Sequence, residues 1–410
     1  MRIPALLREL TFRRYWFGQA VSLFGDQVTL IALPLTAVLI LDAGPAQMGY
    51  LVAAELAPSL LFSLHAGAWI DRRGRRRQTM IATDLGRAAL IATIPLAYAL
   101  DMLTLEHLYV VAFLTGTLVV VFHVAAASLF STLVAREQYV SASSLLYGSR
   151  AFSFVAGPSV GGVIVQIFKA PVALLIDAVS FLVSAAFLAT IDPPEAAAAE
   201  AERGHVAEGL RYIRRTATIR AALAATATVN FFNFMFWALF ILFATEELGV
   251  APGTLGLVLG AAAIGGVIGA IAAGAVSRRI GIGPAFLFSC VLFTVPLVLV
   301  PLAGGPYPLV IAMLLTAEFL SSVGVMILDI SAGAIFAAHI PEYLRARVSG
   351  AYGFVNNGVR PLGALAGGSL GAWIGLRPTL WVASAGAILG VFWLLPSPLP
   401  RLRDLPETSE

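Results

Sequence analysis

The sequence predicts an all-α membrane protein in which twelve transmembrane helices form two pseudo-symmetric six-helix bundles. The composition, the spacing of the apolar runs and the distribution of arginine lead to this prediction. Of the 410 residues, 59% are hydrophobic and 12% are charged, whereas soluble domains average about a quarter charged residues. Apolar runs of about 20 residues cross a bilayer as helices, because a helix satisfies its own backbone hydrogen bonds.

Proline, glycine and charged residues divide the chain into twelve candidate spans, whose ends are set to within about three residues. The predicted spans are 13–41, 46–70, 78–100, 107–134, 142–168, 172–191, 219–245, 253–277, 284–303, 307–337, 347–375 and 377–395. An even number of spans places both termini on one side. Loops on the other side contain only Lys169 and Arg377 as basic residues. The positive-inside bias therefore predicts a multi-pass protein of the cell inner (plasma) membrane with both termini cytoplasmic.

The turn between the second and third spans has the sequence GAWIDRRGRRR at residues 67–77. A glycine in this turn permits the backbone to reverse, and the arginines hold the turn on the cytoplasmic side. We predict a gating motif here, composed of Gly67, Asp71, Arg72, Gly74, Arg75 and Arg76.

The long polar segment 192–218 predicts a cytoplasmic linker. It would join an N-terminal six-helix bundle at 1–191 to a C-terminal bundle at 219–410, which ends in a short cytoplasmic tail. The second part of the linker mixes apolar residues with arginines. Two interpretations stay open for it: a short amphipathic helix on the anionic inner leaflet, or a solvated tether.

Glycine and charge spacing recurs between the two halves at an offset near 206 residues. Gly274, Arg278 and Gly281 repeat the spacing of Gly67, Asp71 and Gly74. The glycines of 157–162 are similarly repeated at 363–368. This recurrence predicts a parallel internal duplication, as in transporters that hold a site between two repeats.

These residues make the chain resemble the major facilitator superfamily over all twelve spans. The family signature G-x-x-x-D-[RK]-x-G-[RK]-[RK] matches residues 67–76. Residues 137–187 and the pair Gly25–Asp26 resemble the branch that holds siderophore exporters and macrolide or multidrug efflux pumps. The family's antiporter motif, typical of exporters, is matched by Gly148, Gly157, Pro158, Gly161 and Gly162.

Ionisable groups inside membrane spans are costly, so each is a candidate for function. We predict that Asp26, near the middle of the first span, couples transport to protons. Further proton-coupling candidates are Glu318, His123 and Asp329. The resemblance implies that spans 1, 4, 7 and 10 bring these four residues toward one aqueous pathway. Many drug:proton antiporters of the family that this chain resembles carry an arginine in the middle of span four. Here that stretch reads GTLVVVFHVAAAS, with His123 as its only ionisable group.

Other ionisable residues of the spans are predicted to form structural pairs. Asp84 and Arg87 are spaced as an i, i+3 pair. We expect Lys169 to pair with Asp177, and Asp329 to pair with an arginine such as Arg345 or Arg347.

The seventh span contains the aromatic and amide-rich run VNFFNFMFWALF. Such a surface is adaptable and largely apolar with a few polar anchors, as a site for amphiphilic molecules requires. Our candidates for the substrate cavity are Asn230, Asn233, Phe234, Trp237, Arg150, Arg360 and Glu55.

The leading hypothesis is a secondary active transporter that works by alternating access, as a proton-coupled exporter of amphiphilic small molecules such as drugs or siderophores. A metabolite importer or facilitator of the same fold is the alternative. A non-transporting receptor or an intramembrane enzyme belongs to another class, but the sequence contains no HExxH, DDxxD or Walker motif. We expect a monomer without cofactor, metal or nucleic acid, whose partners are substrate, protons and the lipid bilayer.

Overall fold

The computed structural model describes residues 5–192 and 206–403. Within these ranges it does not describe the side chains of residues 5, 64–68, 71–73, 206 and 346.

Each predicted span coincides with a helical segment of the described residues. The first half contains α1 (Leu10–Leu41), α2 (Pro45–Arg73), α3 (Arg76–Ala99), α4 (Leu105–Leu133), α5 (Tyr139–Phe168) and α6 (Ala170–Ala189). The second half contains α8 (Ala217–Leu242), α9 (Pro252–Ile280), α10 (Ile282–Thr294), α12 (Tyr307–His339), α13 (Glu342–Ile374) and α14 (Leu376–Leu389). Shorter elements are η1 (Ala5–Arg8), η2 (Arg136–Gln138), α7 (Val206–Arg215) and η6 (Leu399–Arg401).

Ten of these segments are long and apolar enough to cross a membrane, counted over the described residues. The two long helices outside this set are α2 and α13. In α13, Arg345, Arg347 and Arg360 interrupt the apolar sequence.

Three predicted spans change helix type near their ends. The ninth runs from α10 through the 3-10 turn η4 (Val295–Val298) into α11 (Leu299–Leu302). Pro296 and Pro301 lie in this stretch, and proline removes a helical donor and crowds the preceding turn. The seventh ends in the π-helical turn η3 (Phe243–Glu247), and the twelfth in the 3-10 turn η5 (Gly390–Trp393).

The chain divides into two compact units. The first comprises Met1–Ala43, Ala54–Glu202 and Ala251–Leu257, and the second comprises Gly44–Ala53, Arg203–Val250 and Val258–Glu410. The starts of α2 and α9 thus group with the other half of the sequence. The predicted domain limits of 1–191, 192–218 and 219–410 remain a prediction.

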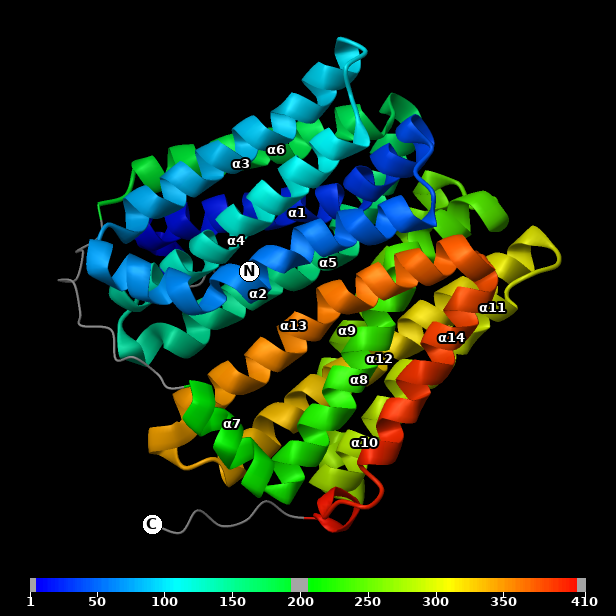
Figure 1. Cartoon of the computed structure of the whole chain (residues 1–410). Coiled ribbons are helices and arrows are strands. Elements are labelled where there is room, and N and C mark those ends of the chain that lie inside the picture. The colour runs from blue at the N-terminus through cyan, green and yellow to red at the C-terminus, as the bar shows by residue number, and fades with distance from the viewer. Residues whose placement is uncertain (1–4, 193–205, 404–410) are drawn as a thin grey trace. The chain divides into compact units, whose positions relative to one another are not determined.

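The same helix pairs pack in both units. In the first unit, α1 packs on α5 and α6, and α3 packs on α4 and α6 (Figure 1). In the second unit, α8 packs on α13 and α14, and α10 packs on α12 and α14. Corresponding helices therefore have corresponding neighbours, as an internal duplication requires.

The turns that follow α2 and α9 each contain a glycine with a positive φ. Gly74 has φ +63° and Gly281 has φ +92°, a backbone region that disfavours residues with a Cβ. Gly74 therefore reverses the chain as predicted.

The linker segment after residue 205 forms the helix α7, which packs on α13. Glu208 lies 2.6 Å from Arg347, and the Tyr212 hydroxyl donates to the backbone oxygen of His339. Ile213 is buried against the same region. The contact of α7 with the inner leaflet stays a prediction.

Candidate functional site

A cavity of about 310 Å³ inside the first unit collects most of its intramembrane charges. Residues of α1 to α6 line it. Its ionisable lining residues are Asp26, Glu55, Arg87, His123, Arg150 and Asp177. The predicted candidates Asp26, His123, Glu55 and Arg150 therefore come together in one place.

Arg87 of α3 is the more enclosed of the two arginines of this cavity, with 2% of its side chain exposed. Its guanidinium lies between two rings, 4.5 Å from the centroid of Phe122 and 4.1 Å from that of Phe181. Nη2 donates to Asp84, and Nη1 lies 3.6 Å from Oδ1 of Asp26. The predicted Asp84–Arg87 pair is confirmed, but Arg87 also reaches Asp26.

Asp26 lies between the enclosed guanidinium of Arg87 and the open part of the cavity. Its side chain is 34% exposed. Glu55, His123 and Arg150 are exposed residues of the same lining. Asp26 is therefore open to exchange with water while it remains in contact with a fixed guanidinium.

Asp177 of α6 lies on another side of the cavity and is buried. It accepts hydrogen bonds from the hydroxyls of Thr29 and Ser180. Gly25 makes room for this arrangement, because a Cβ at that position would overlap Asp177 and Ser180. The absence of a side chain beside Asp26 thus lets α6 approach α1.

The predicted pairing of Lys169 with Asp177 is wrong. Lys169 follows the last residue of α5 and donates to the Tyr98 hydroxyl at 3.0 Å. This hydrogen bond raises the pKa of Lys169. Asp177 lies two turns into α6, where hydroxyls of α1 and α6 are its partners.

The charges of the cavity do not balance. Asp26, Glu55 and Asp177 line the cavity and Asp84 pairs with Arg87, which makes four carboxyl groups against the two guanidinium groups of Arg87 and Arg150. With His123 neutral, full ionisation would leave a formal charge of −2 in a low-dielectric region, which is costly. Bound protons or a bound cation would remove this excess.

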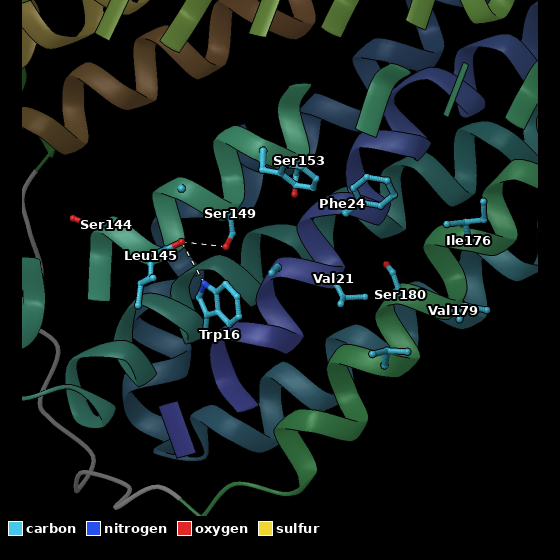
Figure 2. A pocket seen from close by; sticks show the side chains of 14 residues that line it. Trp16, Val21, Phe24, Ser144, Leu145, Ser149, Ser153, Ile176, Val179 and Ser180 are labelled. Carbon is cyan, nitrogen blue, oxygen red and sulfur yellow. Dashed lines mark hydrogen bonds between the residues drawn. The ribbon is translucent and has the colours of Figure 1, made fainter. Parts of the chain in front are cut away.

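A wider groove of about 700 Å³ lies elsewhere on the same unit, between α1, α5 and α6 (Figure 2). Trp16 is at one end and donates from Nε1 to the backbone oxygen of Leu145. Val179 and Phe152 are exposed lining residues. The described lining contains no charged side chain, whereas the smaller cavity holds six ionisable residues.

Polar groups in the second unit connect α8 and α13. Asn230 donates to Asn356 at 3.0 Å, and the hydroxyls of Thr226 and Tyr352 lie 2.6 Å apart. Arg360 lies 5.2 Å from the centroid of the Phe234 ring.

The remaining predicted cavity residues of α8 differ in exposure. Asn233 is buried, and its Nδ2 has no hydrogen-bond partner among the described residues. Trp237 packs edge-on against Phe240. The assignment of Asn230, Asn233, Phe234, Trp237 and Arg360 to a substrate surface stays a prediction.

The two carboxylates of α12 occupy opposite environments. Glu318 is 2% exposed, and its Oε1 has no hydrogen-bond partner among the described residues. Asp329 is exposed. The predicted pairing of Asp329 with Arg345 or Arg347 is wrong, because Arg347 binds Glu208 and Arg345 donates to the backbone oxygen of Ala337.

Glycines of the predicted antiporter motif lie at close helix contacts. A Cβ on Gly157 would lie 2.4 Å from Cβ of Gln27, and one on Gly161 would lie 3.2 Å from Cα of Val28. Gly162 faces the start of α9, which belongs to the same unit. Pro158 is buried, whereas Gly148 has no atom within 4 Å of an added Cβ.

The predicted gating motif is described in part. The side chains at Gly67, Asp71 and Arg72 lie outside the described residues. Arg75 is exposed, whereas Arg76 is buried and its Nη1 lies 3.4 Å from the backbone oxygen of Ser128.

The fold and the charged intramembrane cavity define a multi-pass membrane transporter of the major facilitator superfamily, not an enzyme. The chain belongs to the transmembrane secretion effector family, whose sequence profile matches residues 4–409.

Two multidrug efflux pumps are similar in sequence to nearly the whole chain. The multidrug efflux pump Tap of Mycolicibacterium fortuitum is 26% identical over 400 residues, covering 94% of this chain and 95% of the pump. The Tap pump of Mycobacterium tuberculosis is 27% identical over 408 residues, covering 95% of this chain and 93% of the pump. A bacterial homologue of the iron transporter ferroportin, solved in an inward-facing state, has a TM-score of 0.77 at 17% identity, covering 96% of this chain and 99% of that one. This structural similarity shows the fold alone.

Glu318→Gln is expected to change the pH dependence of transport while the protein stays folded. The amide keeps the size of the side chain but cannot exchange a proton within a buried environment. Transport rates across a pH series would measure the change. Asp101→Asn, at an exposed turn outside the spans, is the control and should keep the wild-type profile. A wild-type profile for Glu318→Gln would make Glu318 structural.

Proposed function

We propose that this protein is a proton-coupled exporter of amphiphilic small molecules. The observation that carries the proposal is the pair of Asp26 and Arg87 in the cavity wall, 3.6 Å apart. The antiporter-motif glycines and the full-length similarity to pumps named for multidrug efflux support the direction of transport. The arginine distribution supports an orientation with both termini cytoplasmic.

The negative charge of Asp26 can be neutralised in two ways in this geometry. When Asp26 is ionised, Arg87 is its counter-charge. When Asp26 takes up a proton, Arg87 keeps its hydrogen bond to Asp84 and its place between Phe122 and Phe181. Protonation therefore changes the charge of the cavity without leaving a buried guanidinium unpaired.

This change in charge is what alternating access requires of a coupling group. A cavity with ionised Asp26 and Glu55 attracts protons or a cationic group of the substrate, and a protonated cavity attracts neither. Substrate and proton would then occupy the cavity in turn, which yields antiport. The apolar lining residues, such as Leu23, Leu30 and Phe154, would contact the apolar part of an amphiphile.

Purified protein in liposomes, with fluorescent amphiphilic dyes such as ethidium as probes, tests the proposal. An imposed pH gradient should drive dye against its own gradient, and a protonophore should stop it. An equal sodium gradient at constant pH should not drive the dye. Equilibration of dye without dependence on the pH gradient would instead identify a facilitator.

Arg87→Gln is expected to destabilise the protein by about 3 to 5 kcal/mol, because it leaves buried Asp84 without its partner. The double variant Arg87→Gln with Asp84→Asn should recover most of this loss, because the buried charge is removed as well. Thermal unfolding in detergent measures both. Arg150→Gln, at an exposed position of the same cavity, should change stability by less than about 1 kcal/mol. Equal effects of Arg87→Gln and Arg150→Gln would contradict the assigned role of Arg87.

A further inference from the structure

A second charged cavity, in the second unit, lies at the turn between α9 and α10. It has a volume of about 730 Å³ and is lined by residues 277–282 together with Arg403. Arg278 and Arg279 come from the last turn of α9, and Arg403 comes from the segment that follows η6. Segments more than a hundred residues apart in the sequence therefore supply its three guanidinium groups.

Backbone contacts fix the position of Arg403 in this cavity. The amide of Ile282 donates to the backbone oxygen of Arg403 at 3.1 Å, and the amide of Gly283 donates to that of Leu402 at 2.9 Å. Gly281 has φ +92°, and a Cβ there would lie 2.9 Å from Cα of Arg403. The fold therefore holds the third arginine against the turn that carries the other two.

Among the residues that the structure describes, the three arginines have no acidic counterpart in the cavity. All three side chains are exposed, no described carboxylate belongs to the lining, and none of the three forms an ion pair with a described residue. Arginine stays charged in proteins, and its planar guanidinium matches phosphate in a bidentate geometry. The site is thus complementary to a phosphate-bearing anion.

The position of the cavity indicates the source of that phosphate. The helices on either side, Pro252–Ile280 and Ile282–Leu302, are both long and apolar enough to cross a membrane. Their shared turn therefore lies at the level of the lipid headgroups. Ile280, which also lines the cavity, is 44% exposed and provides an apolar surface beside the arginines. Basic pockets at the ends of transmembrane helices are typical sites for anionic headgroups.

We propose that Arg278, Arg279 and Arg403 form a binding site for the phosphate of an anionic phospholipid. The site is separate from the charged cavity of the first unit, and the proposal does not depend on the transported substrate. A lipid bound here would link the end of α9, the start of α10 and the C-terminal segment.

Native mass spectrometry of the full-length protein, titrated with phosphatidylglycerol or phosphatidylcholine, tests this site. The most tightly bound phosphatidylglycerol molecule should be lost in a triple variant that carries Arg278→Gln, Arg279→Gln and Arg403→Gln together. Each arginine removed should weaken binding about fivefold. Lysine at the same three positions should retain most of the affinity because the charge is kept. Gly281→Ala should weaken binding without changing the net charge, because it displaces Arg403.

Three results would overturn the assignment. The first is that the protein binds phosphatidylglycerol and phosphatidylcholine with equal affinity. The second is that phosphatidylglycerol binding is unchanged in both the triple glutamine variant and Gly281→Ala. The third is that glycerol 1-phosphate binds the site as tightly as the lipid does. The last result would indicate a soluble phosphate ester in place of a phospholipid.

Discussion

Asp26→Asn is expected to abolish export driven by a pH gradient while the protein stays folded. The amide has the size of the carboxyl group but carries neither a charge for Arg87 nor an exchangeable acidic proton. Uphill transport should fall by about 100-fold, which corresponds to the loss of a coupling free energy near 3 kcal/mol. Dye accumulation in liposomes under a fixed pH gradient measures this loss.

Exchange transport separates coupling from substrate binding. With dye on both sides of the membrane and no gradient, the Asp26→Asn variant should still exchange dye, because exchange needs no net proton movement and Glu55 still provides a carboxylate for a cationic dye. Asp101→Asn is a matched control, since Asp101 is exposed at the turn after α3 and has φ +54°, which asparagine tolerates. Uphill transport at the wild-type rate in Asp26→Asn would remove Asp26 from the coupling mechanism.

The helices were predictable from the sequence because each span carries its own signal. Apolar length, proline and glycine locate every long helix within a few residues, since these properties act locally. The 3-10 turn in the ninth span also follows from a local cause, the two prolines at 296 and 301. The sequence signal was weakest for α13, where Arg345, Arg347 and Arg360 interrupt the apolar run.

The site was predictable only as a set of candidates. The i, i+3 spacing predicts the pair of Asp84 and Arg87, because both partners lie on one helix. The contact of Arg87 with Asp26 and its position between Phe122 and Phe181 involve α1, α4 and α6. Such contacts depend on how the helices are rotated against one another, which no single span determines.

Predicting ion pairs from opposite charges that are close in the sequence gave the wrong partners in two cases. Lys169 and Asp177 are close along the chain, as are Asp329 and the arginines of α13. In the structure, Lys169 donates to the Tyr98 hydroxyl, Asp177 accepts from the hydroxyls of Thr29 and Ser180, and Arg347 pairs with Glu208 of α7. Span four lacks an arginine, yet Arg87 of α3 lies against Phe122, the neighbour of His123. A guanidinium therefore reaches the surface of span four from an adjacent helix.

Gly157→Ala is expected to impair export strongly, because this glycine determines where α1 lies against α5. An added Cβ would lie 2.4 Å from Cβ of Gln27 and 3.4 Å from the backbone oxygen of Phe24. Gln27 is the residue after Asp26, so a shift of α1 here moves Asp26 relative to Arg87. Overpacking of this kind costs about 1 to 3 kcal/mol, and thermal unfolding together with dye transport measures both consequences.

Gly148→Ala provides the matched control on the same helix. Outside its own turn of α5, no atom of the described residues lies within 4 Å of a Cβ at Gly148, so this change should leave transport intact and add up to about 1 kcal/mol of helix stability. Identical behaviour of the two alanine variants would show that the motif acts without close packing. If Gly157→Ala alone loses proton-driven export but keeps dye exchange, the glycines of α5 serve chiefly to position Asp26 against its counter-charge.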